Sequence, residues 1–215
     1  MKKEQFEYIK KYFNIELSDE NFEKLTLFYD EFQKYSSVTN LMSKGDLALL
    51  FEKHIFDSFG ILKCEGFDYS SNLKVLDIGT GGGLPAIPLA ICFPNLKIYA
   101  LDSVSRKINF ISEFKEKAGL ENLEAIWARA ENLKPLGVDL IISRAVGTMK
   151  YIVKNSKKHL NKDGKFIFYK GTKEVLEAEI KELCATDKKF TKITPKIYAY
   201  ELPTEEHHQR HIVEF

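Results

Sequence analysis

The sequence has few cysteines, a single tryptophan and no long apolar segment, and these shortages narrow the class of protein. The three cysteines, Cys64, Cys92 and Cys184, are odd in number, widely spaced and not arranged as CxxC. That spacing argues against disulfides and structural zinc and favours a reducing compartment. The apolar run at 84–93 is too short to cross a bilayer and contains two prolines. Because acids and aromatics occupy the first 13 residues, where a signal peptide is apolar, we expect a soluble cytoplasmic protein.

Arginine is also scarce, with four residues among the 32 basic ones, and 31 acidic residues nearly balance the total charge. The balanced total gives no indication of a nucleic-acid partner. The distribution is uneven, because residues 1–62 hold 8 lysines and 11 acids whereas residues 150–196 hold 13 lysines and 6 acids. The later segment would attract a polyanion, and the alternative is that its lysines form solvated helix faces.

The spacing of apolar residues changes once along the chain, from helical spacing alone to strands that alternate with helices. Apolar residues at helical spacing predict helices over 3–13, 18–35 and 47–62, with Ser18 as the N-cap of the second. From Leu73 onward, strands alternate with helices, which is typical of a parallel sheet covered on both faces. Strands are predicted at 74–78, 97–101, 123–127, 138–142, 164–169, 192–201 and 208–215, and helices at 86–93, 104–118, 148–160 and 173–184. The last two strands have no helix between them and are expected to pair antiparallel.

The segment at 64–72 is the one candidate boundary. We therefore expect an N-terminal helical extension over residues 1–63 and an α/β domain over residues 64–215, packed together as one unit.

The most informative stretch runs from 74 to 94 and reads KVLDIGTGGGLPAIPLAICFP. It predicts a buried strand, a glycine-rich loop and a short apolar helix, an arrangement that lets the backbone approach a nucleotide-like ligand closely. A dinucleotide site would read GxGxxG, but Leu84 occupies the third glycine position, and the spacing of Gly79, Gly81 and Gly83 is GxGxG. The alternative is that the glycines serve only a tight turn, although the loop has more of them than a turn requires.

Two acids indicate which ligand the loop binds. Asp102 lies at the tip of the second predicted strand, where a carboxylate can accept hydrogen bonds from both hydroxyls of a ribose. Asp77 precedes the loop, and its charge disfavours a pyrophosphate but suits an ammonium group, directly or through water. S-adenosylmethionine has a ribose, an ammonium group and no phosphate. The sequence therefore favours this cofactor over a dinucleotide.

Six motifs spread over nearly the whole chain resemble one family, the bacterial small-subunit ribosomal RNA guanine-N7 methyltransferases, also called glucose-inhibited division protein B. The motifs are HIFDS (54–58), VLDIGTGGGLPAIPLA (75–90), LDSVSRKINFI (101–111), ISRAV (142–146), FYKG (168–171) and QRHIVEF (209–215). The chain departs from the family at 81–86, where GPGLPG is frequent, and at Phe32, near which the family has a tryptophan. The first change adds only a methyl group at Ala86, and the second is expected to affect packing more than chemistry.

The resemblance implies an α/β, Rossmann-like class I S-adenosylmethionine-dependent methyltransferase fold. Such a fold has a seven-stranded, mostly parallel sheet with an antiparallel last strand, here with an N-terminal helical extension. The implied activity is methylation of guanine N7 in the 530 loop of 16S ribosomal RNA. The implied substrate is the small ribosomal subunit or an assembly intermediate, and we expect a monomer. The alternatives are a methyltransferase acting on a small molecule or a protein, and a nucleotide-binding protein without catalysis.

Carried over position by position, the resemblance also implies cofactor contacts. It places Gly79 and Leu84 on the methionine and ribose side, Ala130 and Glu131 beside the adenine, and Arg144 at the far wall, where cofactor and target base meet. The residues agree with this independently, because 129–131 and Arg144 follow the third and fourth strands and should project at the carboxyl edge of the sheet.

The chemistry of guanine N7 bears on the remaining candidates. N7 has an exposed lone pair, so no general base or metal is required and catalysis is mainly positioning. A guanidinium matches the acceptors N7 and O6, and Arg144 or Arg129 are therefore the catalytic candidates. The alternative for Arg129 is an ion pair with Glu131 or Asp102.

Other substrate-binding candidates are less specific. The resemblance implies that Asn40 and His54 shape the cleft over the target base, and the alternative is that His54 is a packed helix residue. Lys170 ends a predicted strand, where it contacts RNA phosphate or is merely solvated. Arg210 is a further candidate for RNA binding. Tyr151 is expected to pack rather than to stack on a base.

Overall fold

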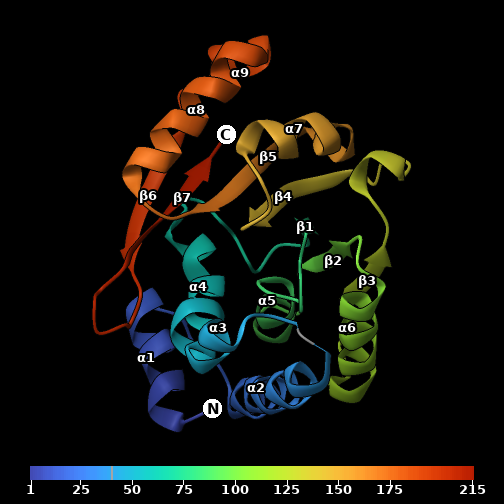
Figure 1. The fold of residues 1–215 in the computed structure, drawn as a ribbon, viewed down its shortest axis with the longest axis vertical. Helices are drawn as coiled ribbons and strands as arrows, with labels where there is room; N and C mark the ends of the chain where they lie inside the picture. The colour runs from blue at the N-terminus through green and yellow to red at the C-terminus, as the bar shows by residue number, and fades with distance from the viewer. Residues whose placement is uncertain (40) are drawn as a thin grey trace.

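A computed structural model describes residues 1–39 and 41–215, which form a seven-stranded sheet with helices on both faces (Figure 1). The strand order is β3-β2-β1-β4-β5-β7-β6. The strands are β1 (Lys74–Ile78), β2 (Lys97–Asp102), β3 (Leu123–Trp127), β4 (Val138–Arg144), β5 (Leu160–Lys170), β6 (Lys196–Glu201) and β7 (Gln209–Glu214). Asn40, a predicted substrate-binding residue, lies outside the described residues.

Strands β1 to β5 are parallel, and β7 runs antiparallel between β5 and β6. The predicted antiparallel pairing of the last two strands is confirmed. Strand β1 pairs with β2 on one side and with β4 on the other, so the sheet grows in opposite directions from it. In this register Ile78 lies between Leu101 and Ser143, and the carboxyl ends of the three central strands therefore share one edge.

Helices cover the sheet in two layers. The helices are α1 (Lys3–Phe13), α2 (Asp19–Thr39), α3 (Lys44–Ala48), α4 (Phe56–Ser58), α5 (Ala86–Cys92), α6 (Ser105–Ala118), α7 (Met149–Ser156), α8 (Lys173–Thr186) and α9 (Lys188–Thr191). Short 3-10 or π turns are η1 (Phe51–Ile55), η2 (Phe59–Lys63), η3 (Ala130–Asn132) and η4 (Lys157–His159). Figure 1 shows α2, α5 and α6 on one side of the sheet and α7 and α8 on the other. No helix in the described part of the chain is both long and apolar enough to span a bilayer.

The N-terminal helices share their core with the sheet. Phe28 and Phe32 of α2 are fully buried, and their rings contact those of Phe110 and Phe114 on α6 at centroid distances of 5.3–6.3 Å. The ring of Phe32 also lies against Gly82, where an added Cβ would overlap it. Helix α2 therefore supports the glycine-rich loop directly.

Two sequence predictions are corrected by the structure. The single helix predicted at 47–62 begins earlier, at Lys44, and is broken into α3, the π turn η1, α4 and the 3-10 turn η2. A π turn shifts the face on which later side chains project, and burial against the sheet has overridden the simple helical spacing here. The strand predicted from 192 begins at Lys196, because 188–191 form α9 and Pro195 lacks an N–H for the ladder.

Truncation of Phe32 tests whether α2 is part of one cooperative unit. We expect Phe32→Ala to lower the free energy of unfolding by about 3–5 kcal/mol, because it opens a cavity under the glycine loop. Val38→Ala is the matched control on the same helix, since Val38 is 83% exposed and its loss should change stability by less than about 0.5 kcal/mol. Urea unfolding measures both, and equal midpoints for the two variants would contradict the prediction.

Candidate functional site

The main cleft opens at the carboxyl edge of the central strands and has a volume of about 740 Å³. Its lining comes from the loops after β1, β2, β3 and β4, from the start of β7, and from the segment between α2 and α4. A crevice at this edge follows from the strand order, because the loops leave β1 and β4 toward opposite faces of the sheet.

The glycine-rich loop forms one wall of the cleft. Gly79 has φ of 67° and donates its N–H to the carbonyl of Leu101 at 2.8 Å. A Cβ on Gly79 would overlap the side chain of Val146, so only glycine fits where these loops meet. Gly81 has φ of 61°, and the position of its absent Cβ has no atom within 4 Å. The loop therefore leaves open space beside its backbone, as a closely approaching ligand requires.

Asp102 lies at the floor of the cleft and is held in place by the backbone. Its Oδ2 accepts a hydrogen bond from Gly81 N at 3.0 Å, and its Oδ1 accepts one from Val104 N at 2.9 Å. The carboxyl is 8% exposed, and Lys107 Nζ lies 3.9 Å from Oδ2. Each carboxylate oxygen retains a lone pair, so Asp102 can accept further hydrogen bonds from a ligand.

Asp77 lies beneath the loop and does not line the cleft itself. It is fully buried, its Oδ2 accepts a hydrogen bond from Ala86 N at 3.3 Å, and its Oδ1 has no hydrogen-bond partner within the described residues. Burial raises the pKa of Asp77 to about 7. Gly83 is likewise outside the lining, because its backbone packs against Ile87. The sequence predicted both residues as cofactor contacts, and the structure places them one layer behind the cleft surface.

The loop after β3 lines the same part of the cleft as Asp102, at the end away from the glycine-rich loop. Ala130 and Glu131 line it, and their carbonyls accept hydrogen bonds from His159 Nε2 at 2.9 Å and from Lys158 Nζ at 2.7 Å. Arg129 is exposed at the rim, and no ion pair joins it to Asp102 or Glu131 over residues 1–39 and 41–215. The ordering of this loop by α7 and η4 thus leaves the Arg129 side chain to solvent.

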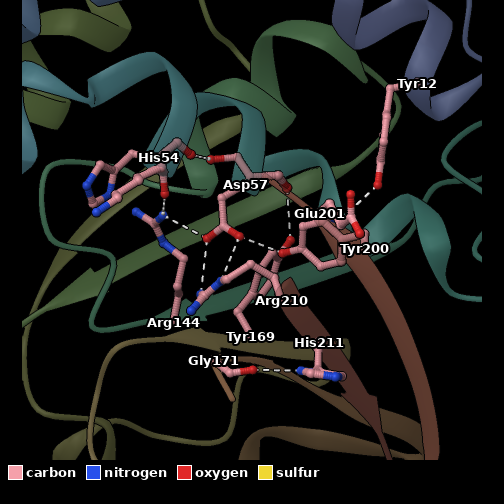
Figure 2. Close-up of polar contacts among 12 residues, drawn as sticks. Tyr12, His54, Asp57, Arg144, Tyr169, Gly171, Tyr200, Glu201, Arg210 and His211 are labelled. Carbon is pink, nitrogen blue, oxygen red and sulfur yellow. Dashed lines mark hydrogen bonds and ion pairs between the residues drawn. The ribbon is translucent and has the colours of Figure 1, made fainter. Parts of the chain in front are cut away.

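A buried acid occupies the other half of the cleft, as Figure 2 shows. Asp57 of α4 is 1% exposed and accepts hydrogen bonds from Arg144 at 3.1 Å, Arg210 at 3.1 and 3.2 Å, and Tyr200 Oη at 2.6 Å. Arg144 also donates to the carbonyl of Lys53 at 3.2 Å. Burial by itself would raise the pKa of Asp57, but the two guanidiniums and the Tyr200 hydroxyl outweigh it, and the net pKa is lowered. Asp57 is therefore ionised at neutral pH.

His54 lines the cleft beside this cluster. Its side chain is 18% exposed, and neither ring nitrogen has a hydrogen-bond partner in the described part of the chain. Burial, and then the positive charge of Arg144, lower the pKa of His54 to about 4. His54 is neutral at pH 7, and its ring has one donor and one acceptor nitrogen, both of them buried.

Of the remaining predicted substrate-binding residues, one lines the cleft and one does not. Arg210, at the start of β7, lines the cleft with Arg144 and His54. Lys170 does not, because its Nζ pairs with Glu179 Oε2 of α8 at 2.7 Å. Tyr151, expected to pack, is 48% exposed and lines the cleft.

Comparisons with known proteins can now be set against this geometry. Residues 21–213 match the family described as rRNA small subunit methyltransferase G. The chain belongs to this family. The protein of that name from Bacteroides thetaiotaomicron is 37% identical over 155 residues, which cover 72% of this chain and 73% of that protein. The one from Christiangramia forsetii is 38% identical over 148 residues, covering 69% and 68%.

The fold is similar to that of a solved methyltransferase structure. A solved structure of a SAM-dependent methyltransferase from Aquifex aeolicus superposes with a TM-score of 0.55 at 18% identity, covering 84% of this chain and 97% of that one. The predicted α/β, Rossmann-like methyltransferase fold is confirmed. Family membership confirms the prediction that the chain is an S-adenosylmethionine-dependent rRNA methyltransferase. The cleft fits that cofactor, since open space at Gly81 adjoins the fixed carboxylate of Asp102 and the unpartnered Oδ1 of Asp77 lies behind it.

Sequence reasoning missed Asp57 and Tyr200 as members of the site. Asp57 falls on the apolar face of the predicted 47–62 helix, and an acid on such a face must be buried with a cation. That was the available signal. Nothing local in β6 distinguishes Tyr200, because its partner is 143 residues away.

Substitution of Asp102 tests the floor of the cleft. We expect Asp102→Asn to weaken S-adenosylmethionine binding roughly 10- to 100-fold, because hydrogen bonds to a charged acceptor contribute about 1.5–3 kcal/mol. Trp127 is the only tryptophan, and its indole N–H bonds the carbonyl of the cleft residue Ser103, so its fluorescence can report the titration. Asp139→Asn, outside the cleft, is the control, and an unchanged dissociation constant in Asp102→Asn would refute the assignment.

The low pKa of His54 predicts a pH-dependent stability. Since the unfolded chain binds this proton near pH 6.5 and the folded one only near pH 4, stability is lost as the pH falls between these values. His54→Gln does not titrate and should lose less melting temperature between pH 7 and pH 5 than the wild type. Asp77 is common to both proteins, so its contribution cancels. Thermal unfolding at the two pH values measures this, and equal losses would show that His54 is not buried as a neutral ring.

Proposed function

We propose that this protein transfers the methyl group of S-adenosylmethionine to N7 of a guanine in 16S ribosomal RNA. We further propose that its substrate is the small subunit or an assembly intermediate and that it acts as a monomer in the cytoplasm. The single observation that carries this proposal is the family match over residues 21–213, which includes both halves of the cleft.

The charges of the cleft support a division of labour between its halves. Asp102 and Glu131 lie in the half formed by β1 to β3, which we call the cofactor half. Lys53, Arg144 and Arg210 lie in the half formed by β4, β7 and the N-terminal segment, which we call the RNA half. Lys107 and Arg129 balance the two acids of the cofactor half, so its fit to a cofactor without phosphate comes from the acceptor atoms of Asp102, whereas the excess of basic side chains in the RNA half suits a polyanion.

In the cofactor half, we assign the ribose hydroxyls to Asp102 and the adenine to Ala130 and Glu131. Gly79, Gly81 and Leu84 line the methionine side, and Asp77 acts from behind the loop on the ammonium group through water. When bound, S-adenosylmethionine would supply a sulfonium methyl group whose carbon the N7 lone pair can attack in line, so that the N–C bond forms as the C–S bond breaks and S-adenosylhomocysteine is released.

In the RNA half, the residues hold the guanine and transfer no proton. N7 must stay free to accept the methyl group, so we assign Arg144 to O6 and the neutral ring of His54 to the donor edge of the base. Arg210 contacts the RNA backbone, as does the exposed Arg129 from the rim of the cofactor half. Holding N7 in line lowers the barrier by converting an encounter into a positioned reaction, which supplies about 7 kcal/mol or more in good cases.

The test combines a substrate assay with one substitution. Purified protein, labelled cofactor and 30S particles lacking the methyl mark should give label in 16S RNA, mapped to one guanine by mass spectrometry. We expect Arg144→Ala to lower turnover about 100-fold, because a small misplacement of the base is costly. Arg106→Ala, an exposed arginine outside the cleft lining, is the control. Label that appears in a protein or a metabolite, and not in RNA, would overturn the proposal.

A further inference from the structure

Asp57 is a buried carboxylate to which the proposed function gives no role. We propose that Asp57 is a positioning residue, which fixes the guanidinium groups of Arg144 and Arg210 so that they meet the RNA in one arrangement. The identity of the RNA rests on the proposed function, whereas the fixing of the guanidiniums is a property of this chain alone.

Every oxygen of Asp57 is engaged in holding a neighbour (Figure 2). Oδ2 accepts from Arg144 Nη1 and Arg210 Nη2, and Oδ1 accepts from Arg210 Nε and the Tyr200 hydroxyl. Arg210 is thus bound through two nitrogens, which sets the plane of its guanidinium as well as its position. One carboxylate therefore orients side chains from β4 and β7, which are separated by β5 in the sheet.

Both guanidiniums keep donors for a ligand. Their side chains are 10% exposed for Arg144 and 22% exposed for Arg210, and both line the cleft. Arg144 Nη2 and Arg210 Nη1 donate to no group in residues 1–39 and 41–215. The contacts with Asp57 and with the Lys53 carbonyl hold the side chains from one side, and the remaining N–H groups are left for the RNA.

The cluster is better explained by orientation than by stability. Removing a carboxylate and two guanidiniums from water is costly, and well-packed apolar residues often stabilise a fold as much as a buried ion pair does. A flexible arginine also loses considerable rotamer freedom when it binds a base, and a cluster that orders it during folding removes that loss from the binding step. An apolar replacement could not orient the guanidiniums in this way.

The substitution Asp57→Asn tests the proposal, because it keeps the shape and removes the charge. We expect turnover to fall roughly 10- to 100-fold through Arg144 and the KM for 30S particles to rise through Arg210. The dissociation constant for S-adenosylmethionine, followed by Trp127 fluorescence, should stay within about twofold, since the cofactor half is untouched. A loss of stability with unchanged kinetics would overturn the proposal.

Glu214→Gln is the matched control. Glu214 is a 7% exposed acid on β7, at the end of the strand away from Arg210, and it pairs with Lys165 at 2.8 Å outside the cleft. Its loss breaks an ion pair that joins β7 to β5 and should lower stability without changing turnover. The double variant Asp57→Asn with Arg210→Met restores the net charge of the cluster; we expect stability to recover and turnover to remain low. Recovery of both would show that Asp57 only balances charge.

A spectroscopic measurement separates this proposal from the proposed function. The chain has only four arginines, so its arginine Nε–H signals in a ¹⁵N spectrum can be assigned with four single Arg→Lys variants. We expect the signals of Arg144 and Arg210 to be ordered in the protein alone and both to become mobile in Asp57→Asn; in the double variant, which lacks Arg210, we expect the Arg144 signal to become mobile. Failure to methylate RNA would refute the proposed function and leave this result standing. Signals that stay ordered without the Asp57 charge would refute the positioning role.

Discussion

The structure depends on the strand order around β1, where the next strands along the chain are added first on one side of β1 and then on the other. Because β2 and β4 flank β1 on opposite sides, the loops that follow β1 and β4 leave toward opposite faces and part at the sheet edge. They still meet at one point, where Gly79 faces Val146 with no room for a Cβ. The positive φ of Gly79 then turns the chain along the edge, and the N–H of Gly81 reaches Asp102 at the tip of β2. The floor of the cleft is thus a product of strand order.

The strand edge supplies a floor and one wall, and the N-terminal segment supplies the other wall. Phe32 of α2 packs under Gly82 and against Phe110 of α6. The same helix therefore packs on the sheet layer and supports the glycine-rich loop. The π turn and α4 then bring both His54 and Asp57 to the lining of the cleft. Gly60 leaves the space that the ring of Tyr200 occupies, which lets β6 approach close enough for its hydroxyl to reach Asp57. An extension built in this way is a structural part of the site.

The sequence predicted those parts of the fold that depend on interactions between residues close together in the chain. Alternating strands and helices, the glycine spacing and the position of Asp102 at a strand tip are all visible in short windows, and the structure places them as expected. Lys170 shows where such reasoning stops, since a strand-end lysine gives no sign that Glu179 on the next helix will bind it. The break in the third helix and the cluster around Asp57 depend on contacts 87 to 153 residues apart. No window of the sequence contains both partners.

The electrostatics of the cleft follow from how few arginines the chain has. Two of the four are held on one buried carboxylate, so the RNA half has a positive charge that Asp57 only partly neutralises. Burial, and then the charge of Arg144, lower the pKa of His54 and keep its ring neutral, so that the ring adds no further charge beside the methyl donor's site. A protonated His54 would repel a sulfonium, whereas the guanidinium of Arg144 is held by Asp57 and the carbonyl of Lys53, and that of Arg210 is held by Asp57 at the start of β7. Asp57 therefore holds two of the four arginines in the RNA half and, by the same contacts, partly neutralises their charge.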